Sequence, residues 1–264
     1  MALSTQLQQA VNKFASHNGP LIIATDFDGV LAPLVDDPNR SRPLPRSVTA
    51  LQRLANSRGG LVHVAYVSGR RIDELVQLAK PVPGSHLYGT HGAQTGYIDS
   101  TGQLVANRTQ LSSHQTETLA AARARAEKLA ASADGAWVEV KETSIVLHTR
   151  LASDRATALI EPDFRDYVAT LDAHAILGHD VTEVSVTDAT KGKAIAALRA
   201  ELGAASVAYF GDDVTDETVF SILTEDDLGV KVGPGDTAAA YRVESPTDVA
   251  YLLEEIADKV NAGL

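Results

Sequence analysis

The chain of 264 residues carries 23 Lys and Arg against 34 Asp and Glu, a formal net charge of −11. That balance argues against a nucleic-acid-binding protein, which normally presents a basic surface, and the length suits one large or two modest domains. The absence of cysteine excludes disulfides, thiolate nucleophiles and zinc sites with cysteine ligands. No run approaches the ~18 apolar residues of a membrane span, and residues 1–16 lack an apolar signal core. We therefore expect a cytoplasmic protein without nucleic-acid or membrane partners, and we take it to be a monomer.

The first ninety residues alternate between amphipathic patterns and short apolar runs. Apolar residues recur at helical spacing in three segments, which predicts helices over residues 3–14, 48–54 and 72–79. Apolar runs bounded by glycine or acidic residues predict buried strands over residues 21–24, 61–67 and 86–88. Strands that alternate with helices are typical of a parallel, doubly wound sheet.

The rhythm changes after Gly92, where a hairpin over residues 94–105 is expected around a polar turn. Further on, we expect helices over 112–132 and 159–171 and strands over 136–141, 144–150, 173–177 and 181–186. Pro162 predicts an irregularity in the second of these helices, because proline removes a backbone donor. The order helix, hairpin, helix, hairpin predicts a separate α+β module.

The alternating pattern returns at Lys191, with a helix expected to about Leu202. Strands over 207–210 and 228–232 and a closing helix over 249–260 follow. We therefore expect one doubly wound α/β domain made of residues 1–109 and 187–264, into which residues 110–186 are inserted.

Polar residues that suit phosphate chemistry follow the predicted parallel strands. They are Asp26 and Asp28 after the first strand, Ser68 and Arg70 after the second, and Asp212, Asp213, Asp216 and Glu217 after a later one; Lys191 opens the helix between them. Ligands of doubly wound sheets bind at the carboxyl ends of the strands. Carboxylates without cysteine suit a hard cation such as Mg²⁺, and a hydroxyl and a lysine suit phosphate oxygens. A single Asp-x-Asp on a loop is more often turn chemistry, but the ordered set favours phosphoryl transfer.

The order Asp26-Phe27-Asp28-Gly29-Val30-Leu31, Ser68, Lys191 and Gly211-Asp212-Asp213 resembles the four motifs of the haloacid dehalogenase superfamily. Longer strings resemble the trehalose-6-phosphate phosphatase family: DFDGVLAPLVDDP at 26–38, VSGR at 67–70, GTHGA at 89–93, LHTR at 147–150 and GDDVTDE at 211–217. The resemblance implies a doubly wound, Rossmann-like core with an inserted α+β cap that recognises the sugar.

The resemblance also implies residue roles for a phosphatase. Asp26 is the expected nucleophile and Asp28 the general acid and then base, while Ser68 and Lys191 hold the phosphoryl oxygens. Mg²⁺ is expected on the Asp26 side chain, the Asp28 backbone carbonyl and Asp212. Substrate binding is expected at Arg70, His91, Gly92, Glu139, Lys141, His148, Arg150 and Glu183.

The strand pattern of the inserted module supports a polar sugar-binding face independently. Glu139 and Lys141 alternate with valines, His148 and Arg150 share the face opposite Ile145 and Leu147, and Glu183 lies opposite Val184. The alternative is a solvated outer face, which is common in antiparallel sheets. We expect Trp137 to pack beneath a helix of the module, since aromatic residues tend to be buried.

Several positions depart from the family's usual pattern: Val30 for Thr, Gln94 for an acidic residue, Thr149 for Tyr and Ser185 for Arg. The expected activity is Mg²⁺-dependent hydrolysis of trehalose 6-phosphate to trehalose and phosphate through an aspartyl-phosphate, the last step of trehalose synthesis. Alternatives are a phosphatase for sucrose 6-phosphate or mannosyl-3-phosphoglycerate, and a non-catalytic sugar-phosphate sensor.

Overall fold

The computed structural model describes residues 3–107, 110–178 and 180–262, and within them the chain forms two units. The core unit comprises Met1–Asn107 and Ala189–Leu264, and the inserted unit comprises Arg108–Asp188. The boundaries expected from the sequence differ from these by two residues at each end, and residue 109 lies outside the described residues.

The core unit contains an eight-stranded sheet in the order β12-β11-β10-β1-β2-β3-β4-β5. Its strands are β1 (Leu21–Thr25), β2 (Val62–Val67), β3 (His86–Gly89), β4 (Gln94–Ile98), β5 (Leu104–Asn107), β10 (Ser206–Gly211), β11 (Leu228–Val232) and β12 (Tyr241–Val243). The strands from β12 to β3 run parallel, and β4 and β5 form an antiparallel hairpin at one edge. The expected doubly wound parallel sheet is therefore confirmed, although the short strand β12 was not predicted.

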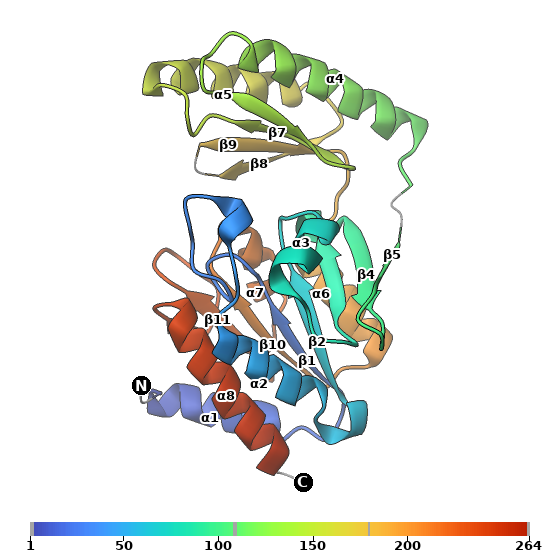
Figure 1. Cartoon of the computed structure of the whole chain (residues 1–264), viewed down its shortest axis with the longest axis vertical. Helices are drawn as coiled ribbons and strands as arrows, with labels where there is room; N and C mark the ends of the chain where they lie inside the picture. The colour runs from blue at the N-terminus through green and yellow to red at the C-terminus, as the bar shows by residue number, and fades with distance from the viewer. Residues whose placement is uncertain (1–2, 108–109, 179, 263–264) are drawn as a thin grey trace. The chain divides into compact units, whose positions relative to one another are not determined.

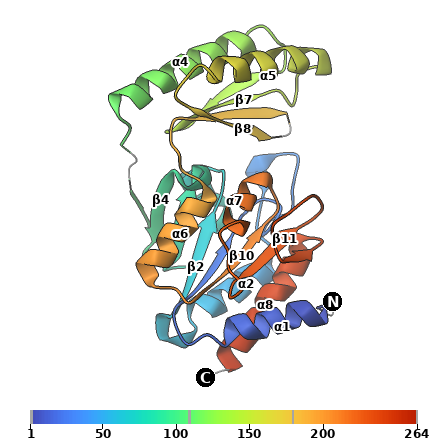
Figure 2. The same ribbon diagram turned by 180° about the vertical axis from the view of Figure 1, so that it is seen from behind.

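Helices cover both faces of this sheet, as Figures 1 and 2 show from opposite sides. They are α1 (Thr5–Ala15), α2 (Pro45–Ala55), α3 (Ile72–Ala79), α6 (Lys191–Leu202), α7 (Glu217–Phe220) and α8 (Pro246–Ala262). Leu21 and Ile23 of β1 pack with α1, α2, α3 and α8, whereas Ile22 and Ala24 pack with α6 and α7. This alternation explains why β1 reads as a continuous apolar run, because both of its faces are buried.

The centre of the sheet is formed by β10, β1 and β2, which are neighbours in that order. From β1 the chain crosses to β2 on one side through α2, and it later enters β10 on the other side after α6. The strand order therefore reverses beside β1, which is where doubly wound sheets bind ligands.

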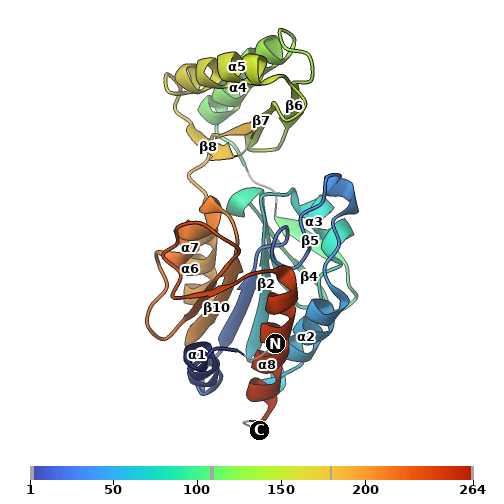
Figure 3. The ribbon, with the colours of Figure 1, turned by 90° about the vertical axis from the view of Figure 1, so that its left-hand side faces the viewer.

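The inserted unit has an antiparallel sheet in the order β6-β7-β9-β8. Its elements are α4 (Ser113–Ala130), β6 (Trp137–Val140), β7 (Ser144–His148), α5 (Asp154–Val168), β8 (His174–Gly178) and β9 (Val181–Ser185). Ile145, Leu147 and Val184 form its core with Ala126 of α4 and Phe164 of α5. Both helices cover one face of this sheet, as the edge-on view in Figure 3 shows.

Two local predictions for the inserted unit were wrong. The helix α5 runs unbroken through Pro162, so the expected irregularity does not interrupt it. The strand β7 ends at His148, so Arg150 does not extend its polar face. A turn takes over there, in which the Thr149 N–H donates to Asp180 and the Ala152 N–H donates back to Thr149. Among the described residues, no helix has the length and apolar character that crossing a bilayer requires.

Candidate active site

Asp26 follows the last residue of the central strand β1 and is 6% exposed. Its backbone N–H donates to Phe210 of β10 at 2.9 Å, which ties the residue to the neighbouring strand. One carboxylate oxygen, Oδ1, accepts the Phe27 N–H at 2.5 Å. The buried strand thus holds the Asp26 side chain at the carboxyl edge of the sheet.

Lys191, the first residue of α6, lies against this carboxylate and is 1% exposed. Its Nζ donates to Asp26 Oδ2 at 2.5 Å and to Asp216 Oδ1 at 2.8 Å. The Thr190 side chain caps the helix by accepting the Lys193 N–H, which fixes where the helix begins. Asp26 and Lys191, both expected to act on the phosphoryl group, therefore lie in contact although 165 positions separate them in the chain.

Asp216 is a member of this cluster to which the sequence analysis gave no role. It is fully buried, and besides Lys191 its Oδ1 accepts the Tyr209 hydroxyl at 2.6 Å. Its Oδ2 accepts the backbone N–H groups of Asp212 and Asp213, both at 2.9 Å. The signal for this role was the position of Asp216 four residues after Asp212, on the turn that precedes α7.

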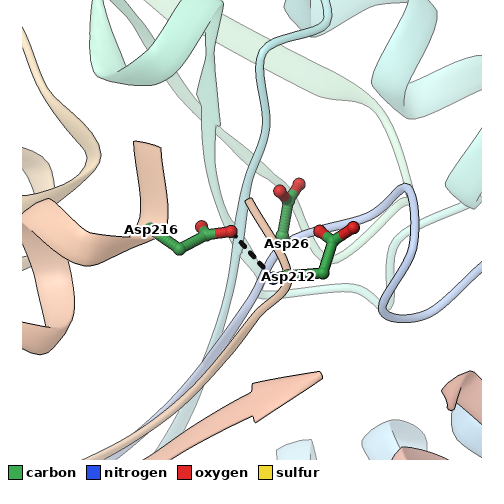
Figure 4. A group of neighbouring side chains, drawn as sticks. All are labelled: Asp26, Asp212 and Asp216. Atoms are coloured by element: carbon green, nitrogen blue, oxygen red, sulfur yellow. Dashed lines mark hydrogen bonds between the residues drawn. The ribbon is translucent and has the colours of Figure 1, made fainter. Parts of the chain in front are cut away.

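Asp212 follows β10 and completes a group of three carboxylates with Asp26 and Asp216, shown in Figure 4. One oxygen from each of these residues lies within 4.8 Å of the others. Gly29 makes room for Asp212, because a Cβ at Gly29 would lie 2.0 Å from Asp212 Oδ2. The φ of +71° at Gly29 is also one that favours glycine.

Lys231 of β11 is a second residue that the sequence analysis missed. Its Nζ is buried and donates to the backbone carbonyl of Asp212 at 2.6 Å. A lysine inside the otherwise apolar strand of residues 228–232 was the available signal, since a buried lysine needs a partner.

The three carboxylates carry more negative charge than Lys191 neutralises. Burial raises the pKa of Asp26 well above its ordinary value, against the opposing effect of Lys191. Burial and then Asp216 raise the pKa of Asp212 to about 7. Burial opposes ionisation of Asp216 too, but Lys191 outweighs it and lowers the pKa of that carboxyl. The cluster is therefore short of positive charge.

A hard divalent cation fits this cluster. The donors that converge are all carboxylate oxygens, which Mg²⁺ prefers as ligands. Burial and the neighbouring Asp216 raise the pKa of Asp212, and a bound divalent cation would supply the positive charge that favours its ionised form. Asp26 and Asp212, two of the expected ligands, belong to this group, whereas the Asp28 side chain does not.

The Asp28 side chain is instead bound by Arg70 and Ser41. Arg70 Nε donates to Asp28 Oδ2 at 2.6 Å, and Arg70 Nη2 donates to Asp28 Oδ1 at 2.8 Å. The Ser41 hydroxyl also donates to Oδ1 at 2.8 Å, and Arg70 Nη2 reaches the carbonyl of Pro38. Arg70, expected to bind substrate, thus has two of its nitrogens on the candidate acid, and Ser41 was not predicted.

Ser68 follows β2, next to β1, and is 2% exposed. Its hydroxyl oxygen accepts the Arg70 N–H at 3.2 Å, and its carbonyl accepts the His91 N–H at 2.9 Å. His91 and Gly92 lie in a tight turn after β3, and Gly92 packs against the backbone of Thr190 at the start of α6. Ser68, His91 and Gly92 therefore surround the same end of the sheet as Asp26.

The substituted Gln94 has a structural contact. Its side-chain oxygen accepts the Ile72 N–H at 2.9 Å, at the first residue of α3. An amide oxygen satisfies this helix N–H as a carboxylate would, so the change from the usual acidic residue leaves the helix end satisfied.

In the inserted unit, the expected polar face is formed by paired side chains. Glu183 accepts hydrogen bonds from Lys141 Nζ at 3.0 Å and from the Ser144 hydroxyl at 2.6 Å. Glu139 Oε2 lies 2.9 Å from His148 Nε2, and this contact holds the pKa of Glu139 below its ordinary value. Four of the five predicted side chains therefore lie on one face of this sheet.

The predicted positions of Arg150 on this face and of Trp137 beneath a helix were wrong. Arg150 lies beyond β7, beside a hollow of about 280 Å³ lined also by Asp154, Glu161 and Arg165. Trp137 does not pack beneath a helix: it is 40% exposed and stacks on His148. The two-residue period of β6 puts Trp137 on the same face as Glu139, and this period outweighs the general tendency of aromatic residues to be buried.

Comparisons with known proteins point to one family. Residues 24–254 match the family described as Trehalose-phosphatase. The trehalose-6-phosphate phosphatase of Escherichia coli (strain K12) is 31% identical over 236 residues, covering 88% of this chain and 84% of that protein. The trehalose-phosphate phosphatase of Mycobacterium ulcerans (strain Agy99) is 30% identical over 254 residues. That alignment covers 89% of this chain but 61% of the relative, so the chain spans about three fifths of the mycobacterial protein.

Solved structures of trehalose-6-phosphate phosphatases have the same fold as this chain. The solved C-terminal domain of trehalose-6-phosphate phosphatase from C. albicans superposes with a TM-score of 0.79 at 19% identity, covering 97% of this chain and 98% of that one. An Aspergillus fumigatus trehalose-6-phosphate phosphatase superposes with a TM-score of 0.70 at 22% identity, covering 95% and 97%. The family match over most of the chain, the E. coli relative and the acidic cluster at the strand ends together show that this chain belongs to the trehalose-phosphatase family.

Proposed function

We propose that this chain is a Mg²⁺-dependent phosphatase that hydrolyses trehalose 6-phosphate to trehalose and phosphate. The observation that carries the proposal is the contact between the buried Asp26 and Lys191 at 2.5 Å, beside Asp212, in a chain of this family. A carboxylate nucleophile, a cation for phosphate oxygens and a set of metal ligands are the parts that phosphoryl transfer to an aspartate requires.

In the proposed reaction, a carboxylate oxygen of Asp26 attacks phosphorus and the bond from phosphorus to the sugar oxygen breaks. Asp28 gives its proton to that sugar oxygen, because a sugar alkoxide is a poor leaving group. Water then attacks phosphorus and gives a proton to Asp28, the bond to Asp26 breaks, and inorganic phosphate leaves. Lys191 and Ser68 bind phosphoryl oxygens throughout.

Asp26, Asp212 and the Asp28 carbonyl would hold the Mg²⁺ ion, with Asp216 close by. When bound, the cation offsets the repulsion between the phosphate dianion and Asp26. The protein's own part is to keep Asp26 ionised and aimed. Lys191 favours the ionised form of Asp26 against the effect of burial, and the Phe27 N–H holds its other oxygen.

The inserted unit is the proposed sugar-recognising cap. Glu139, Lys141, His148 and Glu183 offer both donors and acceptors, which the hydroxyls of a disaccharide need. Contacts with the sugar, which does not react, would help to orient the phosphate for attack by Asp26.

Two other functions make different predictions. A phosphatase for sucrose 6-phosphate or mannosyl-3-phosphoglycerate would use the same core with a different cap. A non-catalytic sensor would bind a sugar phosphate without turnover, but a sensor has no need of Asp28 with a dedicated arginine partner.

Release of inorganic phosphate from a substrate panel tests the proposal. The panel contains trehalose 6-phosphate, sucrose 6-phosphate, mannosyl-3-phosphoglycerate, glucose 6-phosphate and 4-nitrophenyl phosphate, each with Mg²⁺ and with EDTA. We expect the highest kcat/KM for trehalose 6-phosphate and no release with EDTA. Preference for another sugar phosphate would reassign the substrate, and binding without any release would support the sensor.

A further inference from the structure

Trp137 of the inserted unit has no role in the proposed reaction. It is the first residue of β6, which forms an edge of the sheet in the inserted unit, and it pairs directly with His148 of β7. The alternation of β6 puts Trp137 and Glu139 on one face and Val138 and Val140 on the other. Trp137 therefore belongs to the polar face.

The indole ring of Trp137 has a defined orientation. Its ring and the His148 ring are parallel within 6°, with their centroids 4.5 Å apart. His148 is itself fixed, because its Nε2 lies 2.9 Å from Glu139 Oε2. One face of the indole is thus covered by a ring that a carboxylate holds in place, while 40% of the residue stays exposed.

Charged and polar groups lie on the same face as this aromatic pair. Glu139 is contacted by His148, and the Lys141–Glu183 pair lies on the same face, with Ser144 bonded to Glu183. An exposed aromatic ring beside convergent hydrogen-bonding groups is the chemistry of a site for a ligand that is apolar on one side and polar at its edge.

We propose that Trp137, backed by His148, is a stacking surface for the apolar C–H face of a hexopyranose ring. A pyranose chair presents C–H groups on its faces and hydroxyls around its rim. Its face would lie on the indole while its hydroxyls reach Glu139 and its neighbours. The inference rests on the proposed function for the identity of the sugar, trehalose, and it makes Trp137 a positioning residue for the part of the substrate that does not react.

The competing explanation is that the Trp137–His148 pair only stabilises the sheet. Cross-strand aromatic pairs do contribute to sheet stability. A stabilising role predicts equal losses with all substrates and a lower melting temperature. A stacking role predicts a loss confined mainly to substrates that carry the sugar.

Fluorescence tests the stacking directly, because Trp137 is the only tryptophan in the chain. We would titrate the 264-residue chain with trehalose, and its inactive Asp26→Asn variant with trehalose 6-phosphate in the presence of Mg²⁺. The expected result is a saturable change in emission with both ligands and none with inorganic phosphate or sorbitol. No response to either sugar, or the same response to phosphate alone, would overturn the inference.

Kinetics supply the second readout. For Trp137→Ala we expect KM for trehalose 6-phosphate to rise roughly 3- to 10-fold, the range of an aromatic stacking contact, with a smaller effect on 4-nitrophenyl phosphate. Trp137→Phe should recover most of the loss. Val140→Ala is the matched control, because Val140 is an exposed apolar residue of the same strand on its other face. Equal losses of Trp137→Ala with both substrates would assign a purely structural role.

The two experiments separate this inference from the proposed function. If the protein hydrolyses no sugar phosphate, the proposed function fails, and the trehalose titration alone decides whether Trp137 binds a sugar. If the protein hydrolyses trehalose 6-phosphate but Trp137→Ala matches the wild type and fluorescence is silent, the function stands and the inference is wrong.

Discussion

The guanidinium of Arg70 occupies both carboxylate oxygens of Asp28, at 2.6 and 2.8 Å. Two parallel hydrogen bonds fix the orientation of the Asp28 carboxylate, so in the proposed reaction Arg70 positions the acid. Arg70, which the sequence predicts to bind substrate, therefore also contacts Asp28.

Replacing Arg70 by lysine should lower kcat for trehalose 6-phosphate by about tenfold. Lysine keeps the charge but loses the two-pronged geometry, and charge-assisted hydrogen bonds of this kind are worth ~1.5–3 kcal/mol. The loss should be smaller for 4-nitrophenyl phosphate, whose leaving group needs little protonation. Arg71→Lys is the control, because the Arg71 side chain is 43% exposed and pairs with Asp73. An undiminished kcat in Arg70→Lys would show that Arg70 does not position the acid.

Replacing Gly29 by alanine should abolish activity and Mg²⁺ binding. The added methyl group would lie 2.0 Å from Asp212 Oδ2, so Asp212 must move. Gly102→Ala separates this collision from backbone strain, since Gly102 also has a positive φ, +85°, but no atom within 4 Å of an added Cβ. Both variants should lose ~1–2 kcal/mol of stability from the left-handed backbone. Calorimetric Mg²⁺ titration and phosphate release should then distinguish them; full activity in Gly29→Ala would place Asp212 outside the site.

Mg²⁺ should stabilise the protein more at about pH 8 than at about pH 5.5. The pKa of Asp212 rises from 3.8 to about 7 on folding, so its contribution to stability is fully present below pH 3.8 and is lost as the pH rises through 7. A bound cation replaces the proton, and below pH 7 its affinity should fall about tenfold per pH unit for each proton displaced. Thermal melts with Mg²⁺ and with EDTA at both pH values measure this. Asp212→Asn should remove the difference, and an equal Mg²⁺ effect at both pH values would argue against Asp212 as a ligand.

Glu183→Gln should reduce kcat/KM for trehalose 6-phosphate by ~10-fold or more, with a smaller loss on 4-nitrophenyl phosphate. A desolvated charged hydrogen bond is worth ~1.5–3 kcal/mol, and Glu183 is only 6% exposed. Glutamine is a better probe than alanine, because removing the carboxylate entirely leaves the buried Lys141 without its 3.0 Å contact. Glu142→Gln, an exposed glutamate in the turn before β7, is the control. Equal losses on both substrates would mean that Glu183 supports the fold instead of the sugar.

The sequence predicted those features of the fold that follow from a local pattern of apolar and polar residues. Apolar runs that end in Asp26, Ser68 and Asp212 predicted three strand ends, and a parallel sheet brings such ends to one edge. The contacts that failed to appear in the sequence analysis depend on tertiary packing. Ser41 reaches Asp28 from a separate loop, and no spacing in the chain announces that bond.

Errors arose where two rules conflicted or where a signal was short. For Trp137, the tendency of aromatic residues to be buried predicts packing beneath a helix, whereas the alternation of β6 places it on the polar face with Glu139. The apolar pattern predicts a strand as far as Arg150, but the turn through Thr149 and Asp180 ends β7 two residues earlier. The three residues of β12 carry too little pattern to predict a strand.

The covalent role of Asp26 is tested most directly by trapping its phosphorylated form. Wild-type protein turning over trehalose 6-phosphate with Mg²⁺ would be quenched in acid, reduced with borohydride, digested and sequenced by mass spectrometry. Borohydride converts an aspartyl phosphate to homoserine, so a nucleophilic Asp26 predicts homoserine at position 26 and nowhere else, with none when substrate is omitted or in Asp26→Asn. Homoserine at another aspartate, or intact Asp26 in an enzyme that is demonstrably turning over when quenched, would contradict it.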